Sequence, residues 1–421
     1  MALVSPFQAV RFNPSLDLSK HVTQPYDKIP PALHADYRNR SPHNIVNLIL
    51  PDERKTTDPG VSKYQHAARL FSEWNSQDVL VRDPVPGLYP YRQAYELNGT
   101  AFTRAGFIGL CNVEDYAARI VFPHERTLSN PKADRYALLD AGRVHYGLIF
   151  LLYEDDGTIQ ACLDACMQTP AGASVTDDFS ALNELWQLAD PDTVRHMTDA
   201  MADKQVFIAD GHHRYETSLM YARNHPDDPR AQYTMAMFVN INSQLEILPT
   251  HRSVRGISEA TRELFPSRLR QCFDVRACSS LADVQAALQK PSPTVRLGGY
   301  DGSAWWTAEL RGDDAMRAAA PDMSVDWRAL DVAVLHTLVL ENVLGISQDM
   351  VAGGEYVSYH RDPVEAVSRV SAGADQFAFF LQPTKPSQLC AVARNGEVMP
   401  QKSTDFYPKL LTGLTMYAMN A

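Results

Sequence analysis

The run DGHHR at residues 210–214 is the part of the sequence whose residue types most clearly suggest chemistry. It follows the apolar stretch 205–209 and precedes apolar residues at helical spacing, so we expect a strand, a tight turn and a helix. The first amides of a helix attract anions, and basic side chains there oppose the helix dipole unless an anion is bound. The motif therefore predicts a phosphate site whose ligands are Gly211, His212, His213 and Arg214.

Two other interpretations of this run stay open. Asp210 could simply cap the helix, with Gly211 as a turn residue. His212 and Glu216 are four residues apart and could bind a metal from one helix face, but nothing in the sequence nominates a third ligand. The zinc motif H-E-x-x-H is absent, because the segment that starts at His124 lacks the last histidine. We therefore expect no transition-metal site.

A second polar stretch, PHERT at residues 123–127, combines an acid, a base and a hydroxyl group, and Lys132 and Arg135 follow it. Glu125 could act as a general base on a substrate hydroxyl if the fold brings it near the phosphate. A solvated loop with local salt bridges is the alternative, and composition alone favours that alternative.

A third stretch, MPQKSTDFYPK at residues 399–409, is rich in groups that suit phosphate. It lacks the leading glycines of a P-loop, and the chain contains neither G-x-x-x-x-G-K-[ST] nor G-x-G-x-x-G, so we expect no P-loop and no Rossmann site. Residues 25–27 (PYD) and 250–252 (THR) are weaker candidates. Each of these two, taken alone, is more typical of a turn than of a ligand site.

The elements that must position these residues mix helices and strands. Apolar spacing predicts helices over 61–75, 136–142, 177–188, 258–265, 281–288 and 327–344, the last ending at Gly345. Strands are expected at 89–97 and 100–113 around the turn Asn98-Gly99, and at 147–153, 205–209, 234–241 and 245–250. A strand pair should turn at Asp301-Gly302, and the chain should end in two strands (at 376–383 and from Leu389), a polar loop and a final helix.

The predicted fold class is α/β (α+β), in three consecutive parts. An N-terminal part covers 1–99, a core with the PHE and DGHHR boxes covers 100–256, and a C-terminal α/β part with the MPQKST loop covers 257–421. The length of 421 residues and the 45% of hydrophobic residues fit such a multidomain globular chain.

The charge balance limits the partners of the chain. Its 39 basic and 50 acidic residues give a net charge of -11, so the basic surplus typical of a nucleic-acid-binding protein is absent. The first residues do not resemble a secretory signal, and no apolar run is long enough to span a bilayer. The six cysteines are scattered without a C-x-x-C pair, and we expect them to be reduced. These features predict a cytoplasmic protein without nucleic-acid or membrane partners, and they leave a homodimer open.

Five segments together resemble the family called domain of unknown function 1015. They are PYDKI, PHERTLSNPKADR, VFIADGHHRYETSL, LPTHR and MPQKSTDFYPKLLTG, in the order of the family. More distantly, the DGHHR box resembles the phosphate-binding box of the ParB/sulfiredoxin superfamily. That superfamily includes CTP-binding ParB proteins, ATP-using sulfiredoxins and free L-serine kinases. The resemblance implies a ParB/sulfiredoxin-like core with additional N- and C-terminal α/β parts.

The similarity to the free-serine kinases implies a nucleotide-dependent phosphotransferase for a small hydroxyl metabolite, with serine as the leading candidate, ATP or ADP as donor and magnesium as cofactor. Glu125 would deprotonate the hydroxyl, and Asp210 would assist through magnesium or by orienting the hydroxyl, with His213 as a third catalytic residue. The implied phosphate ligands are Gly211, His212, His213, Arg214, Thr127, Lys132 and Arg135. The implied substrate-binding residues are Tyr26, Asp27, His124, His251, Arg252, Lys402, Ser403 and Thr404.

Two alternatives remain at this point, a regulator and a hydrolase. Sulfiredoxin chemistry is disfavoured, because its box has a cysteine where this chain has His212. A nucleotide-binding regulator of the ParB type would use the same phosphate site without turnover. A phosphoester hydrolase would use the same groups with water as the nucleophile. The sequence also leaves open whether the donor is ATP, ADP or pyrophosphate.

Overall fold

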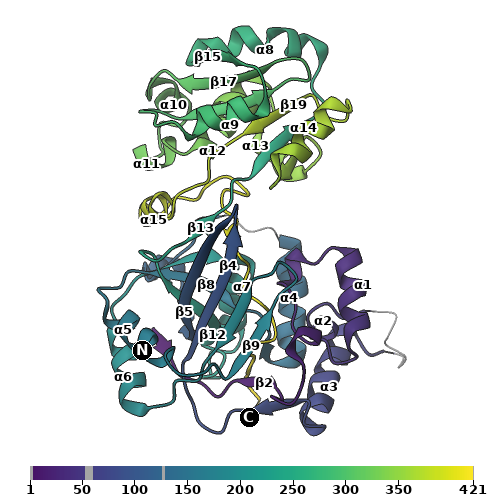
Figure 1. The fold of residues 1–421 in the computed structure, drawn as a ribbon, viewed down its shortest axis with the longest axis vertical. Coiled ribbons are helices and arrows are strands. Elements are labelled where there is room, and N and C mark those ends of the chain that lie inside the picture. The colour runs from purple at the N-terminus through teal and green to yellow at the C-terminus, as the bar shows by residue number, and fades with distance from the viewer. Residues whose placement is uncertain (1–2, 53–59, 126–128, 421) are drawn as a thin grey trace. The chain divides into compact units, whose positions relative to one another are not determined.

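The computed structural model describes residues 3–52, 60–125 and 129–420 (Figure 1). Its contacts divide the chain into two compact units. Unit 1 holds the described residues of Met1–Pro123, Thr127–Leu245 and Pro408–Ala421, and unit 2 holds those of His124–Arg126 and Glu246–Tyr407. This division differs from three consecutive parts, because the C-terminal segment returns to unit 1 and a few residues after Pro123 belong to unit 2.

Unit 1 is built on a mixed nine-stranded sheet in the order β6-β11-β8-β12-β5-β4-β10-β9, with β1 beside β5. Strand β11 pairs in parallel with β6 and antiparallel with β8, and β12 pairs in parallel with β8. The strands are β1 (Val4–Ser5), β4 (Tyr89–Leu97), β5 (Thr100–Asn112), β6 (Val121–Phe122), β8 (Ile149–Tyr153), β9 (Ala173–Thr176), β10 (Leu182–Leu185), β11 (Val206–Asp210) and β12 (Tyr233–Asn240).

Helices cover both faces of this sheet (Figure 1). Helices α5 and α6 pack on one face, while α2, α3 and α4 form a separate hydrophobic cluster with the N- and C-terminal segments. The helices are α1 (Pro31–Arg40), α2 (Val46–Ile49), α3 (Lys63–Ser76), α4 (Ser129–Gly142), α5 (Thr158–Cys166), α6 (Pro191–Met201) and α7 (His212–Asn224). Helix α4 packs against α7, which follows β11.

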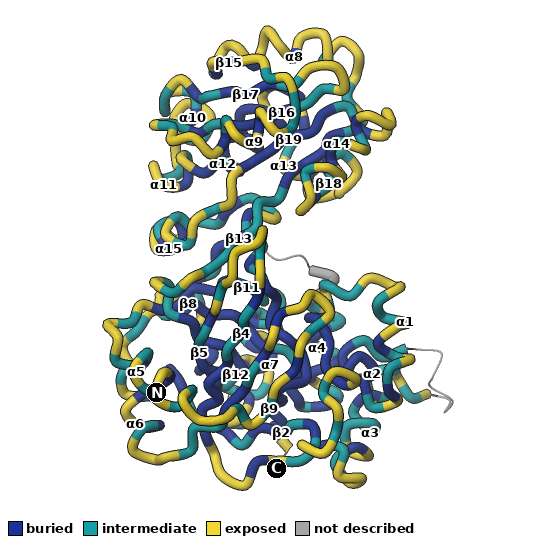
Figure 2. Tube along the Cα trace, viewed as in Figure 1, coloured by how far each residue is buried: buried dark blue, intermediate teal, exposed yellow. Residues whose placement is uncertain are grey.

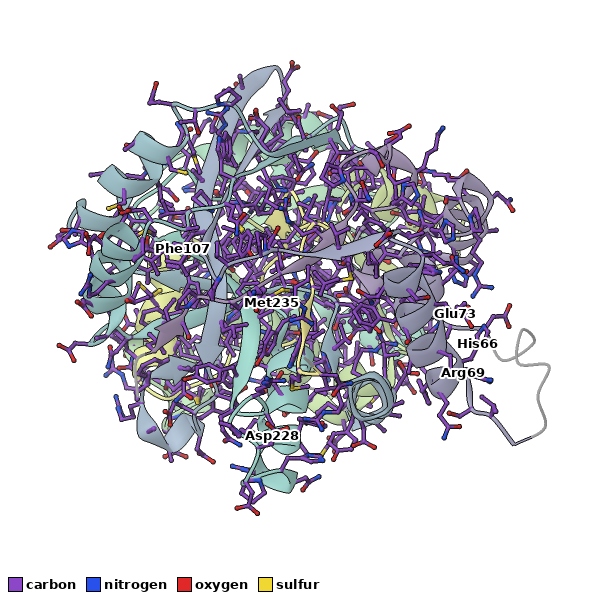
Figure 3. All side chains as sticks on the ribbon, turned by 90° about the horizontal axis from the view of Figure 1, so that it is seen from below. His66, Arg69, Glu73, Phe107, Asp228 and Met235 are labelled. Carbon is purple, nitrogen blue, oxygen red and sulfur yellow. The ribbon has the colours of Figure 1, made fainter. Side chains whose placement is uncertain are left out.

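Because both faces are covered, side chains on both sides of the central strands are buried (Figure 2). Phe107 of β5 stacks on Phe238 of β12 with ring centroids 5.0 Å apart, and Met235 of β12 is also fully buried. Both labelled residues lie in the interior in Figure 3.

Helix α3 shows the amphipathic pattern that the sequence predicts. Ser62 is the N-cap residue of its capping box. Ala67 and Trp74 are buried. His66, Arg69 and Glu73 lie on the outer side of the helix (Figure 3).

Unit 2 contains a six-stranded antiparallel sheet in the order β15-β17-β16-β19-β14-β18. The strands are β14 (His251–Val254), β15 (Phe273–Cys278), β16 (Arg296–Tyr300), β17 (Trp305–Leu310), β18 (Val357–His360) and β19 (Phe377–Phe380), and a separate pair joins β13 (Glu246–Ile247) to β20 (Phe406–Tyr407). Helices α9 (Leu281–Gln289) and α14 (Pro363–Ser371) pack on the sheet around Phe380. The other helices are α8 (Glu259–Cys272), α10 (Asp314–Ala319), α11 (Val325–Arg328), α12 (Asp331–Val334), its π-helical continuation η5 (Leu335–Val343), α13 (Gln348–Gly353) and α15 (Pro386–Arg394).

Most predicted elements are present, and three are wrong. The helix expected over 177–188 is a turn followed by β10, because these residues pair with both β4 and β9. The strand expected from Leu389 is part of helix α15. The final helix is also wrong, because the end of the chain runs extended, with Met416 bonded to Val10 and Tyr417–Ala418 paired with β7 (Val144–His145). At 177–188 and at the C-terminus, pairing with distant strands outweighs local preference, whereas α15 has the local signals of a helix, with Pro386 in its first turn.

In the part of the chain that the structure describes, no helix combines the length and the apolar character needed to cross a membrane.

Gly106 should be essential for the centre of the unit 1 sheet. A Cβ atom at this position would lie 2.2 Å from the carbonyl oxygen of Phe238. We expect Gly106→Ala to lower the free energy of unfolding by about 3 kcal/mol, because strand β12 would have to move. Urea unfolding checks this, with Gly172→Ala as control, since its Cβ would lie 3.6 Å from the nearest atom. Equal stability of the two variants would contradict the close strand packing.

Candidate active site

The DGHHR segment forms the predicted strand, turn and helix at the end of β11. Gly211 has a φ of 96°, in the left-handed region that favours glycine. The missing side chain also leaves room for Arg214, since a Cβ at Gly211 would lie 3.1 Å from its Nε. Among the described residues no side chain caps α7, so Asp210 is not the helix cap.

Asp210 is instead held between two cations. Its Oδ2 accepts a hydrogen bond of 2.7 Å from Arg214 Nη2, and its Oδ1 accepts one of 3.0 Å from Lys409 Nζ. Burial alone would raise the pKa of Asp210, but Lys409, Arg214 and Lys28 outweigh burial and hold this pKa well below its usual range. Asp210 is therefore ionised at neutral pH.

A fourth cation, Arg104, also acts on Asp210. Its side chain is fully buried and donates to Gln93 Oε1 and to the carbonyl oxygen of Pro408. Burial lowers the pKa of Arg104 to about 10, so this residue remains charged at neutral pH. We call Lys28, Arg104, Asp210, Arg214 and Lys409 the Asp210 cluster. Its four positive charges and single carboxylate attract anions.

Tyr26 and Arg135 lie beside this cluster. The guanidinium of Arg135 lies 4.3 Å from the ring centroid of Tyr26, and its Nη1 donates to the carbonyl oxygen of Ile49 at 2.8 Å. Burial raises the pKa of Tyr26, and the charges of Arg214 and Asp27 also act on it. Tyr26, Arg135 and Arg214 line a common cavity of about 70 Å³ in unit 1. The PYD segment and the DGHHR segment therefore meet at this cavity.

Two predicted phosphate ligands, Arg214 and Lys132, already have partners in the protein. Arg214 is not free, since it bonds Asp210 and the carbonyl oxygen of Leu148. Lys132 forms an ion pair with Glu216, which removes Glu216 as a partner of His212 on a metal. His212 is buried and His213 is half-buried in the first turn of α7. Thr127 lies outside the described residues.

The same contacts bear on magnesium. Both oxygens of Asp210 face cations, an arrangement that does not suit a magnesium ligand. Across residues 3–52, 60–125 and 129–420, no group of three or more His, Cys, Asp or Glu side chains could hold a metal ion.

A second group of predicted residues meets in unit 2. Glu125 forms a parallel bridge with Met399, and Met399 N donates to the carbonyl oxygen of His124 at 2.8 Å. His124 Nε2 lies 2.8 Å from Thr404 Oγ1, and Lys402 N donates to Glu125 Oε1 at 3.4 Å. The PHE and MPQKST segments, far apart in sequence, thus form one cluster, which we call the Glu125 cluster.

Arg252 anchors this cluster from strand β14. Its buried guanidinium donates to the carbonyl oxygens of Thr250, of Gln401 at 3.3 Å and of Lys402 at 2.9 Å. Burial lowers the pKa of Arg252 to about 10, and the charge of Glu125 counteracts part of this shift. Ser403 donates to the carbonyl oxygen of Pro400 at 2.5 Å and so stabilises the same loop.

The contacts of His251 are those of a buried residue with a structural role. Its ring packs edge-on against Phe380 at 5.6 Å, and its Nδ1 accepts a hydrogen bond of 3.4 Å from Leu381 N. Burial lowers the pKa of His251 to about 4, so the imidazole is neutral at pH 7.

The predicted site residues therefore gather in two places, one in each unit. Tyr26, Asp27, Lys132, Arg135 and residues 210–214 belong to unit 1, whereas His124, Glu125, His251, Arg252 and residues 402–404 belong to unit 2. The role of Glu125 as a general base for a phosphate bound at residues 210–214 stays a prediction. Sequence reasoning missed Lys28 and Arg104, and it included Lys409 only as the last residue of the stretch 399–409. Lys28 and Lys409 stand inside segments that the family resemblance singles out, but Arg104 has no signal in its strand pattern.

Unit 2 also contains a Ser-His-acid arrangement. Ser253 Oγ lies 2.7 Å from His360 Nε2 and donates to Asp375 Oδ2 at 2.5 Å, and His360 Nδ1 lies 3.4 Å from Glu365. Ser253 is fully buried in β14, and Arg369 pairs with Asp375 at 2.6 Å. A nucleophile must reach a substrate, so this network is structural and does not support a serine hydrolase.

The chain belongs to the family described as "Protein of unknown function (DUF1015)", whose model matches residues 4–333. Four of the five segments that resemble the family lie within this range, and the MPQKST segment lies beyond it. No curated protein matches the chain.

Three solved structures match part of this chain at low TM-scores. SbnI with a C-terminal truncation, from Staphylococcus aureus, has a TM-score of 0.38 at 12% identity, covering 72% of this chain and 85% of that chain. A conserved hypothetical protein from Pyrococcus furiosus has a TM-score of 0.36 at 10% identity and coverage of 71% and 92%. A free serine kinase in complex with AMP has a TM-score of 0.34 at 11% identity and coverage of 68% and 83%. At these scores, function must be argued from the residues of this chain.

The ion pair between Asp210 and Lys409 should be strongly coupled. We expect Lys409→Met to lower the free energy of unfolding by about 2 kcal/mol or more, because Asp210 loses one of its two direct partners. In a double-mutant cycle with Asp210→Asn, the coupling energy should be about 1–3 kcal/mol. The exposed pair Arg311–Asp274 is the control and should couple by less than about 1 kcal/mol. Additive effects at Asp210 and Lys409 would contradict the described geometry.

Proposed function

We propose that this chain is a nucleotide-dependent phosphotransferase that phosphorylates the hydroxyl group of a small metabolite, with free L-serine as the leading candidate. The observation that carries the proposal is the Asp210 cluster, in which four cations act on one carboxylate at the start of α7. Phosphoryl transfer depends mainly on positioning and on neutralising the charge of the phosphate oxygens. Preorganised cations beside a helix N-terminus meet both requirements.

In the proposed reaction, the phosphates of ATP or ADP bind at the turn through Gly211, His212 and His213, with Lys409 and Arg214 as cationic partners. The acceptor hydroxyl oxygen attacks the terminal phosphorus, the bond from phosphorus to the bridging oxygen breaks, and the shortened nucleotide leaves. Glu125 takes the hydroxyl proton. Asp210 is a positioning residue that orients Arg214 and Lys409 through its two hydrogen bonds.

Chain connectivity supports a joint role for the two boxes. Strand β6 lies parallel to β11, with Phe122 opposite Phe207, and Pro123 follows β6 directly. The PHE segment thus starts at the carboxyl end of β6, and the DGHHR segment starts at the carboxyl end of the neighbouring parallel strand β11. Ligands of mixed α/β sheets bind beyond the carboxyl ends of such parallel strands. We also propose, on the similarity of the DGHHR box, that the core is ParB/sulfiredoxin-like.

The charge of Asp210 gives a test of the phosphate site. We expect Lys409→Met to weaken ATP binding about 10- to 100-fold, because one charge-assisted contact is lost. Asp210→Asn should also weaken ATP binding, to the same degree with and without magnesium, because Arg214 and Lys409 lose the carboxylate that orients them. Isothermal titration calorimetry measures both. Weaker binding by Asp210→Asn, seen only with magnesium present, would contradict the positioning role and favour a metal-bound Asp210.

Replacing Glu125 distinguishes an enzyme from a protein that only binds nucleotide. Glu125→Gln should bind nucleotide like the parent but turn over about 10²–10⁴-fold more slowly, because the proton acceptor is lost. Product is measured by ³¹P NMR with ATP, ADP or pyrophosphate as donor and serine, threonine or homoserine as acceptor. Glu96→Gln, at an exposed position of β4, is the control.

Other outcomes identify the alternatives. Unchanged turnover in Glu125→Gln would refute the base. Binding without product for every pair would favour the ParB-type regulator, and release of inorganic phosphate alone would favour the hydrolase.

A further inference from the structure

Three buried polar atoms near Arg252 lack a hydrogen-bond partner among the described residues. They are Arg252 Nε, Tyr359 Oη and His336 Nε2. Arg252 and Tyr359 are directly opposite residues of the paired strands β14 and β18, and the guanidinium lies 5.5 Å from the Tyr359 ring centroid. His336 belongs to η5, and the charge of Arg252 acts on it. Unsatisfied buried polar groups are rare, and three around one cation require an explanation.

In the part of the chain that the structure describes, the hydrogen bonds of Arg252 bring no carboxylate into direct contact with its guanidinium. All its hydrogen bonds go to backbone carbonyl oxygens, and within the described ranges no carboxylate lies within 4.0 Å of its side-chain nitrogens. A buried cation without a close anion is costly, so a stable site of this kind is typical of residues that receive an anion from a ligand.

The charges around Arg252 indicate which anion fits. Burial lowers the pKa of His336 to about 3 and that of His251 to about 4, so both rings are neutral at pH 7 and Arg252 supplies the positive charge. Glu125 already acts on Arg252 and Tyr359 with a negative charge. A dianionic phosphate would therefore be poorly balanced, whereas a single carboxylate matches the one planar guanidinium.

We infer that Arg252, Tyr359 and His336 bind the carboxylate of a small amino-acid or hydroxy-acid ligand beside Glu125. This inference rests on the proposed function for the role of the ligand as phosphoryl acceptor, and it adds that the acceptor is a carboxylic acid. Carboxylate binding itself requires only unit 2 residues and no turnover.

Tyr359→Phe tests the site in the full-length protein. Arg252 is unsuitable, because its replacement would also release the backbone of residues 401–402. Since Tyr359 Oη has no hydrogen-bond partner among residues 3–52, 60–125 and 129–420, the unliganded variant should melt at or above the temperature of the parent. Tyr153→Phe is the matched control, because its hydroxyl is likewise buried without a partner but belongs to β8 of unit 1.

Binding is measured by calorimetry without nucleotide, with L-serine, L-threonine, L-homoserine, ethanolamine and inorganic phosphate as probes. The parent and Tyr153→Phe should bind at least one of the three amino acids, and they should not bind ethanolamine, which is serine without its carboxylate. Tyr359→Phe should weaken amino-acid binding about tenfold, the usual loss of a hydrogen bond to a charged group.

Three results would overturn the inference. The parent could bind none of the three amino acids, or it could bind inorganic phosphate and no amino acid. Tyr359→Phe could also bind the amino acid with the same affinity as the parent. If the amino acid binds as described and no donor yields a phosphorylated product, the carboxylate site stands and the proposed function fails.

Discussion

The two ion pairs of Asp210 are the interaction on which the proposed phosphate site in unit 1 depends. They join the end of β11, the first turn of α7 and the C-terminal segment that begins at Pro408. The returning segment is fixed further by the β4–β5 hairpin, because Gln93 donates to the carbonyl oxygen of Lys409 and Arg104 donates to that of Pro408. A local motif thus becomes a charged site only when the chain end has packed into the sheet.

Both clusters use a buried arginine in the same way. Arg104 in unit 1 donates to the carbonyl oxygen of Pro408, and Arg252 in unit 2 donates to those of Gln401 and Lys402. Such an arginine keeps its positive charge available to the surroundings while it holds a loop in place. This arrangement explains how a chain with a net charge of -11 can present two locally positive sites.

The sequence predicts those parts of the site that local signals encode. The strand, the turn at Gly211 and helix α7 follow from apolar spacing and from glycine, and α3 follows from its capping box and its apolar face. The role of Lys409 depends on the return of the chain end, which no periodicity reveals. The errors at 177–188 and at the C-terminus have the same origin, since residues suited to a helix pair there with strands distant in sequence. The resemblance to the family covers segments that are distant in sequence, and it implied binding roles for Tyr26, Arg135 and Lys402.

The central claim is that the positive turn after β11 binds nucleotide phosphates. A crystal structure with adenosine 5′-O-(3-thiotriphosphate) tests it most directly, because anomalous scattering from the sulfur locates the terminal phosphorus. We expect phosphate oxygens within about 3 Å of the backbone nitrogens of Gly211 and His212 and of Lys409 Nζ. Nucleotide phosphates bound elsewhere, with the Asp210 cluster unchanged and unliganded, would contradict it.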